Sequence, residues 1–124
     1  MSASPCLRRV RQLESAGYIS RYVAVLNQRR LGLGIVAFVE LKVPQVSSDA
    51  IVQRFKEAVR LERSIVACYL TAGQFDFVLK VIAEDMDHYS RLTQDVLLRL
   101  PGVQDMRSTF VVEAVKDTTE LPIS

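Results

Sequence analysis

Arginine is concentrated at the amino-terminal end of the chain, where it could contact nucleic acid. Residues 1–30 contain six arginines, no lysine and one acid, Glu14, a formal balance of +5. The other 94 residues contain ten basic and thirteen acidic residues, a balance of −3. Guanidinium groups bind phosphates and base edges through paired hydrogen bonds. The charge distribution therefore predicts a nucleic-acid surface at this end and a weakly acidic body behind it.

One helix is expected to carry most of these arginines. Cys6, Val10 and Leu13 recur at the spacing of a single apolar stripe, which should be buried. Ser2 is a candidate N-cap, and Gly17 supplies a left-handed stop. A solvated surface would also explain the arginines, but their density without lysine favours groove and phosphate contacts. The side chains expected to contact DNA are Ser4, Arg8, Arg9, Arg11, Gln12 and Arg21.

Neither catalysis nor metal binding is predicted. His88 is the only histidine, and it has no second ligand at metal spacing, so a solvated surface role is expected. Glu84 and Asp85 suit a helix N-terminus, where Asp85 should be the cap. Cys6 and Cys68 are expected to be reduced, small apolar side chains. Since no nucleophile, base and orienting group can be assembled, we expect no enzyme and no cofactor.

Length and composition predict one compact domain with a small appendage. The chain has 124 residues, 49% of them hydrophobic, enough to bury one core. No apolar run is long enough to cross a bilayer, and the basic N-terminus lacks the apolar centre of a signal peptide. The expected location is the cytoplasm.

Behind the basic helix, apolar periodicity predicts alternating strands and helices. Val, Ile and Phe dominate the expected strands, Ser47, Ser48 and Asp49 are candidate caps of the first body helix, and Pro101 and Gly102 follow the second. The order is β-α-β-β-α-β, an α+β ferredoxin-like sandwich of the dimeric α+β barrel type, with both helices on one face. Strands are expected at residues 35–43, 64–71, 75–83 and 103–116, helices at about 49–59 and 86–100, and a tail at 117–124.

The open face of this sheet is expected to be covered. A half-solvated strand alternates apolar and polar residues, but residues 65–70, IVACYL, are apolar at both alternating sets, as are 35–39 and 110–112. The cover that we expect is the same face of a second subunit, which predicts a homodimer.

These residues together resemble the Lrp/AsnC (leucine-responsive, feast/famine) transcription regulators. SASPCLRRVRQLESAGYISRYVAVLN resembles the family's recognition helix, wing strand and linker, and the β-α-β-β-α-β body resembles its amino-acid-binding (RAM) domain. Gly73-Gln74-Phe75-Asp76 matches a Gly-x-aromatic-Asp turn of the family. The implied domains are a partial winged helix-turn-helix at 1–22, a linker strand at 23–33, the RAM domain at 34–116 and the tail.

The resemblance implies a free amino acid effector, bound where dimers meet, with the turn formed by Gly73, Gln74, Phe75 and Asp76 in the pocket. Gly73 would let a ligand carboxylate approach backbone N–H groups, and Asp76 would accept hydrogen bonds from an ammonium group. Ser108 and Thr109 would come from a neighbouring subunit. The structural alternative is that Gly73 permits a positive φ in a tight turn and Asp76 bonds the turn's own backbone.

The function implied is that of an amino-acid-responsive, DNA-binding regulator that forms dimers, and further tetramers or octamers. A helix-turn-helix needs two helices ahead of the recognition helix, and this sequence starts at that helix. The DNA-binding head is therefore expected to be truncated and to bind DNA weakly. Two alternatives remain, a stand-alone amino-acid sensor that does not bind DNA and a small dimeric ferredoxin-like enzyme.

Overall fold

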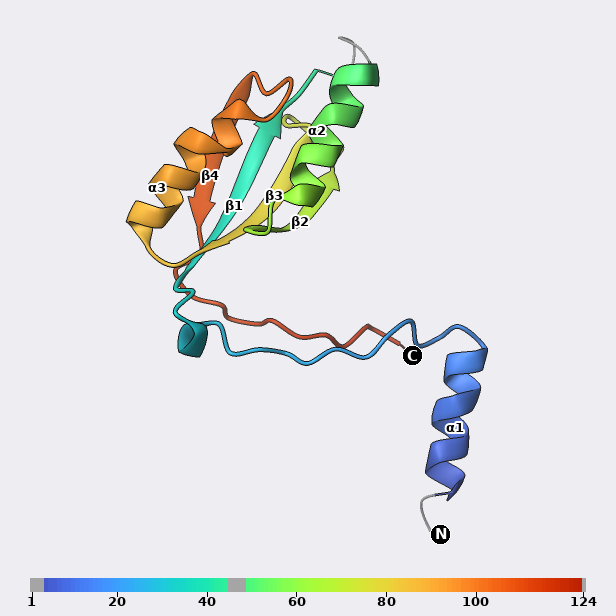
Figure 1. Cartoon of the computed structure of the whole chain (residues 1–124). Coiled ribbons are helices and arrows are strands. Elements are labelled where there is room, and N and C mark those ends of the chain that lie inside the picture. The colour runs from blue at the N-terminus through green and yellow to red at the C-terminus, as the bar shows by residue number, and fades with distance from the viewer. Residues whose placement is uncertain (1–3, 45–48, 124) are drawn as a thin grey trace.

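The computed structural model describes residues 4–44 and 49–123. A basic helix stands apart from a sheet covered by two helices, and a long extended segment joins them (Figure 1). The elements are α1 (Ser4–Ser15), η1 (Arg29–Leu31), β1 (Ile35–Lys42), α2 (Asp49–Leu61), β2 (Ile65–Leu70), β3 (Phe77–Ala83), α3 (Met86–Asp95), η2 (Leu97–Arg99) and β4 (Asp105–Phe110).

The body is a four-stranded antiparallel sheet in the order β2-β3-β1-β4. Helices α2 and α3 cover the same face of it (Figure 1). β1 lies in the centre and pairs with β3 from Ile35 opposite Ala83 to Leu41 opposite Phe77. The predicted ferredoxin-like order is confirmed, and it leaves β2 and β4 as edge strands.

The core lies between the sheet and its two helices. Val39 and Leu41 of β1 and Leu79 of β3 are fully buried, because the alternation of each strand turns these side chains toward the helices. Phe55 of α2 packs on Phe77, with ring centroids 4.6 Å apart. The helical spacing of α2 therefore buries one stripe against the sheet, as its sequence predicts.

β2 departs from simple alternation. A register shift between Ile65 and Ala67 inserts one extra residue, the signature of a β-bulge. Beyond it, Cys68 and Leu70 pair with buried residues of β3, whereas Ala67 and Tyr69 pair with half-buried ones. Residues 65–70 therefore do not divide into the two simple alternating sets that were expected, since alternation alone does not reveal a bulge.

One expected strand is absent, and another is shorter than expected. Residues 23–33 contain no strand but an extended segment followed by η1, since no neighbouring backbone completes a ladder there. β4 ends at Phe110 rather than near residue 116. Val111 still donates its N–H to the Val36 carbonyl at 2.9 Å. Because β1 begins at Ile35, it has no further residues to pair with the chain after Val111. The second body helix also ends early, at Asp95, and continues as η2.

The face of the sheet opposite the helices is only partly covered. Val36, Phe38 and Lys80 on this face, with the extended segments before β1 and after β4, line a hollow of about 810 Å³. The two segments run side by side (Figure 1). They expose large apolar side chains, Val25 at 82% and Val112 at 96%. No helix within residues 4–44 and 49–123 is long and apolar enough to cross a bilayer.

Candidate functional site

The turn at residues 71–76 connects β2 to β3 and is closed by backbone hydrogen bonds. The Thr71 N–H donates to the Asp76 carbonyl at 2.8 Å, and the Thr71 hydroxyl donates to the Phe75 carbonyl at 3.1 Å. The Lys42 ammonium reaches across from β1 and donates to the Gln74 carbonyl at 3.1 Å. Four of the six candidate effector residues, Gly73, Gln74, Phe75 and Asp76, thus lie in one hydrogen-bonded loop at the end of β1.

Asp76 joins this turn to β1 through both its backbone and its side chain. Its N–H donates to the Leu41 carbonyl at 3.0 Å, and its Oδ2 accepts from the Val43 N–H at 2.9 Å. The carboxylate is half-buried. One carboxylate oxygen therefore bonds the backbone just after β1 and not the turn's own backbone, which differs from the structural alternative.

Gly73 has a different status from the three glycines with positive φ. Its φ is not positive, and a Cβ built on it would meet no atom within 4 Å. The structural explanation for this glycine, a positive φ in a tight turn, is therefore wrong. Nothing in the fold of one subunit demands glycine here, so the space above it is open to an approaching molecule.

Arg107 is a residue at this site that the sequence reasoning missed. Its guanidinium donates to both carboxylate oxygens of Glu40 at 3.1 Å and lies 5.0 Å from the centre of the Phe75 ring. It shares the open face of β4 with Thr109, because Arg107 pairs with Glu40 and Thr109 with Phe38. Alternation along β4 would have placed it there. Both signs of charge thus lie beside the turn.

Ser108 and Thr109 point to opposite faces of β4. The Ser108 hydroxyl shares a 2.6 Å hydrogen bond with the hydroxyl of Tyr89, a buried residue of α3. Thr109 lies on the open face. Within one subunit Lys42 and Arg107, not these hydroxyls, reach the turn.

The basic helix α1 presents its arginines freely. The side chains of Ser4, Arg8, Arg11 and Gln12 line one surface along the helix. Arg9 and Arg21 are also exposed, the latter on the extended segment after the helix. Five of the six expected DNA-contacting residues therefore lie on one helix, and four of them share a surface.

The apolar stripe of α1 is not buried in the single chain, although its spacing is typical of a stripe that packs against other elements. Cys6 and Leu13 are exposed and Val10 is half-buried, since no other element of the described chain packs on the helix. The predicted stop is confirmed, because Gly17 has φ +85° and Tyr18 N–H donates to the Leu13 carbonyl at 2.9 Å. The caps expected at Ser2, Ser47 and Ser48 lie outside the described residues.

His88 is partly exposed and also has a structural role at the start of α3. Asp85 caps α3 as predicted, accepting from the His88 N–H at 2.8 Å. In return the Nδ1 atom of His88 accepts from the Glu84 N–H at 3.0 Å. Within the described ranges, no three His, Cys, Asp or Glu side chains come together in a way that could hold a metal ion.

Comparisons with known proteins point to one family. The profile of the Lrp/AsnC ligand binding domain matches residues 36–121. The leucine-responsive regulatory protein of Escherichia coli K12 is 41% identical over 123 residues, which cover 99% of this chain and 74% of that protein.

Solved structures agree. A transcriptional regulator from Neisseria meningitidis in complex with L-methionine is 36% identical, with a TM-score of 0.89 over 96% of this chain and 76% of that one. The feast or famine regulatory protein of Mycobacterium tuberculosis, also complexed with L-methionine, is 25% identical, with a TM-score of 0.74 over 98% and 79%. The chain is therefore a member of the Lrp/AsnC family of transcriptional regulators.

Proposed function

We propose that this regulator responds to a free amino acid bound at the 71–76 turn and transmits the response to DNA through α1. The open space above Gly73 is the observation that carries the proposal. A glycine that neither the backbone nor a neighbouring atom requires is explained by the close approach of a ligand. Two relatives were solved with L-methionine, which supports an amino acid as the ligand.

The charges around the turn suit a zwitterion. The carboxylate of Asp76 would accept from the α-ammonium group, while the turn's backbone N–H groups and the Lys42 ammonium would bind the α-carboxylate. Arg107, held by Glu40 over the Phe75 ring, would limit the space for the effector side chain. The proposed effector residues are thus Gly73, Gln74, Phe75 and Asp76, with Lys42 and Arg107 beside them.

A second subunit would complete the site. The open sheet face and the apolar side chains of the two extended segments, Val25 and Val112 among them, suit burial against the same face of another copy. Thr109 lies on that face, so its hydroxyl is the one that we propose a neighbouring subunit contributes, whereas the Ser108 hydroxyl bonds Tyr89 on the helix side of β4. Analytical ultracentrifugation at micromolar concentration should show at least a dimer, and a monomer would contradict this part.

Thermal unfolding with each of the twenty L-amino acids tests the effector site. An effector at one hundred times its dissociation constant should stabilise the fold by about 2.7 kcal/mol through mass action. Gly73→Ala should keep the fold, because its new Cβ meets no protein atom. It should lose the response to the effector, because this Cβ would occupy the space through which the ligand approaches. Asp76→Asn keeps an acceptor for the Val43 N–H but removes the charge that binds ammonium.

The matched control is Asp95→Asn, an exposed acid at the end of α3. It should respond as the wild type does. If neither Gly73→Ala nor Asp76→Asn weakens a response that the wild type shows, the effector binds elsewhere. If no amino acid stabilises the wild type, the sensing proposal fails.

DNA binding is tested by gel shift across a salt series. Arg8, Arg9, Arg11 and Arg21 would contact phosphates and bases, and the location that we propose for this action is the cytoplasm. Removal of one arginine that binds a phosphate should reduce the slope of log K against log salt by about 1. Arg9→Ala should show this reduction, whereas Arg63→Ala, an exposed arginine of the body, should not. An amino-acid response without DNA binding at low salt would favour the stand-alone sensor.

A further inference from the structure

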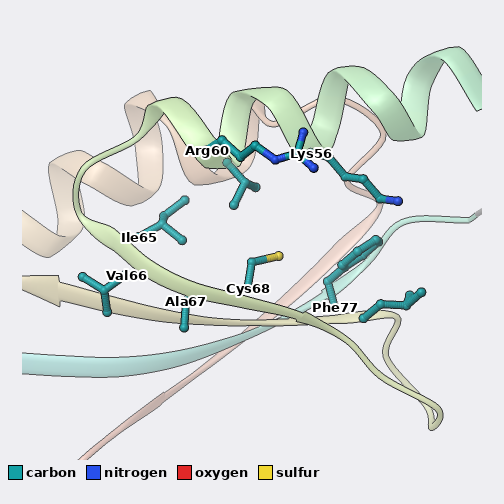
Figure 2. A pocket seen from close by; sticks show the side chains of 9 residues that line it. Lys56, Arg60, Ile65, Val66, Ala67, Cys68 and Phe77 are labelled. Atoms are coloured by element: carbon teal, nitrogen blue, oxygen red, sulfur yellow. The ribbon is translucent and has the colours of Figure 1, made fainter. Parts of the chain in front are cut away.

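A second cavity, remote from α1, opens between α2 and the edge strand β2 (Figure 2). It measures about 430 Å³, within the range of about 300 to 1,000 Å³ typical of small-molecule sites. Lys56 and Arg60 extend over it from α2, and Cys68 points from β2 toward the helix (Figure 2). The register shift in β2 accounts for Cys68 lying on this side of the strand.

Two positive charges dominate the cavity. Burial raises the pKa of the Cys68 thiol, while the charges of Arg60 and Lys56 lower it in part. Both cations therefore act on the same point at the base of the cavity. Lys56 forms no ion pair within the described chain. Arg60 lies 3.5 Å from Glu57, but both side chains are largely exposed, so this pair is weak.

The remaining lining is apolar. Val59 of α2, Ile65 and Leu70 of β2 and Phe77 of β3 form the floor and walls, and no carboxylate is among the lining residues. A ligand with an anionic head and an apolar chain would match both parts. An α-ammonium group would find two cations and no acceptor carboxylate, so the cavity disfavours zwitterions.

We propose that this cavity binds a small aliphatic carboxylate, with its head on Lys56 and Arg60 and its chain over Ile65, Leu70 and Phe77. The site is separate from the 71–76 turn and selects the opposite chemistry, a monoanion rather than an amino acid. It does not depend on the proposed effector role of that turn. Because Leu70 and Phe77 flank the turn directly, the two sites share the same pair of strands.

Alkylation of Cys68 with iodoacetamide at mildly alkaline pH gives a readout specific to this cavity. Hexanoate should protect Cys68, by about tenfold at about ten times its dissociation constant, because the occupied cavity excludes the reagent. Cys6, exposed on α1, should react at an unchanged rate in the same sample. Hexanamide has the same chain without the charge, and norleucine adds an ammonium group, so both should protect much less.

The double variant Lys56→Gln/Arg60→Gln should raise the hexanoate dissociation constant by about tenfold, the effect of losing a charged hydrogen bond. At the hexanoate concentration that protects the wild type about tenfold, the variant should therefore be protected only about twofold. Protection is compared as a ratio within each protein, since removing the cations also alters the thiol itself. The matched control is Arg54→Gln/Arg63→Gln, which removes two exposed arginines near the cavity that do not line it. This control should be protected as the wild type is.

Several results would overturn the proposal. Equal protection by hexanoate and hexanamide would show that the cavity does not recognise the negative charge of the ligand. Equal protection by norleucine would show that the cavity does not exclude zwitterions. Protection by inorganic phosphate as strong as that by hexanoate would show that the apolar wall contributes nothing. If the Lys56→Gln/Arg60→Gln variant is protected as strongly as the wild type, or if the wild type is not protected at all, the proposed carboxylate site is wrong.

Discussion

Helices α1 and α2 have similar amphipathic patterns and opposite fates. In α2, Val52, Phe55 and Val59 are buried against the sheet, whereas no residue of α1 is buried. Both sequences predict a helix with an apolar stripe, and both form one. The two helices differ in whether another element of the chain packs on the apolar stripe. The periodicity of one helix does not predict whether such an element exists.

The same contrast holds for charge. In the body, Arg107 pairs with Glu40 and lies 5.0 Å from the centre of the Phe75 ring, so its charge has partners within the chain although its side chain is 59% exposed. In α1, the arginines are exposed on the helix surface. Residues that hold the fold together and residues that are free to bind a partner are thus separated along the chain, which makes each group testable by matched substitutions.

The largest expected difference is in the free energy of unfolding. Leu79→Ala empties a fully buried position in the core and should cost about 2 to 5 kcal/mol. Leu13→Ala removes a side chain that is 43% exposed and should change the value by less than about 0.5 kcal/mol. Urea unfolding followed by circular dichroism measures both. An equally large effect of Leu13→Ala would show that α1 is packed against another subunit in solution.

Two glycines with positive φ sharpen the comparison. Gly102→Ala adds backbone strain and places a Cβ 2.8 Å from Ile51 Cγ2 and 3.2 Å from Val43 Cγ1, so we expect a loss of about 2 to 4 kcal/mol. Gly17→Ala has the same strain without a clash. It should leave the unfolding midpoint of the body unchanged and speed amide exchange at Tyr18. A shifted midpoint would mean that α1 and the body unfold together.

The 71–76 turn gives the next largest effect. Asp76→Ala removes the acceptor of the partly buried Val43 N–H and should cost about 1 to 3 kcal/mol. Asp76→Asn keeps an oxygen in place and should cost clearly less. Thermal unfolding without ligand separates the two variants. Equal costs would show that the charge of Asp76, not its hydrogen bond to β1, stabilises the turn.

The sequence was sufficient for the fold where a periodic segment finds its partners within the chain. The strands near residues 35–43 and 75–83 pair as expected, and Asp85 caps α3. The failures share one cause, since they depend on neighbours that a local pattern does not specify. Residues 23–33 lack a partner strand, and the pairing of β4 with β1 stops near the first residue of β1.

The candidate site was predictable only in part. The turn at Gly73 and Asp76 is identifiable because it lies between two predicted strands and matches a family pattern. Arg107 is separated from that turn by about thirty residues and meets it only through the pairing of β1 with β4. The β-bulge that turns Cys68 toward α2 has no glycine or proline to mark it.

The two cysteines provide the smallest expected effect and the last comparison of the two regions. Burial holds the pKa of the half-buried Cys68 thiol above its ordinary value of 9.0. Since folding favours the protonated thiol, its contribution to stability is present below pH 9.0 and is lost as the pH rises toward the higher pKa of the folded state.

Because of this raised pKa, Cys68 should react slowly with iodoacetamide, and its rate should still increase with pH above 9.0, where the rate of an ordinary thiol levels off. Cys6, exposed on α1, should react faster at neutral pH, and Cys68→Ala isolates its signal. Equal rates for the two thiols at neutral pH would show that the α2–β2 edge opens readily in solution, and the contrast between a closed body and an open α1 would not extend to that edge.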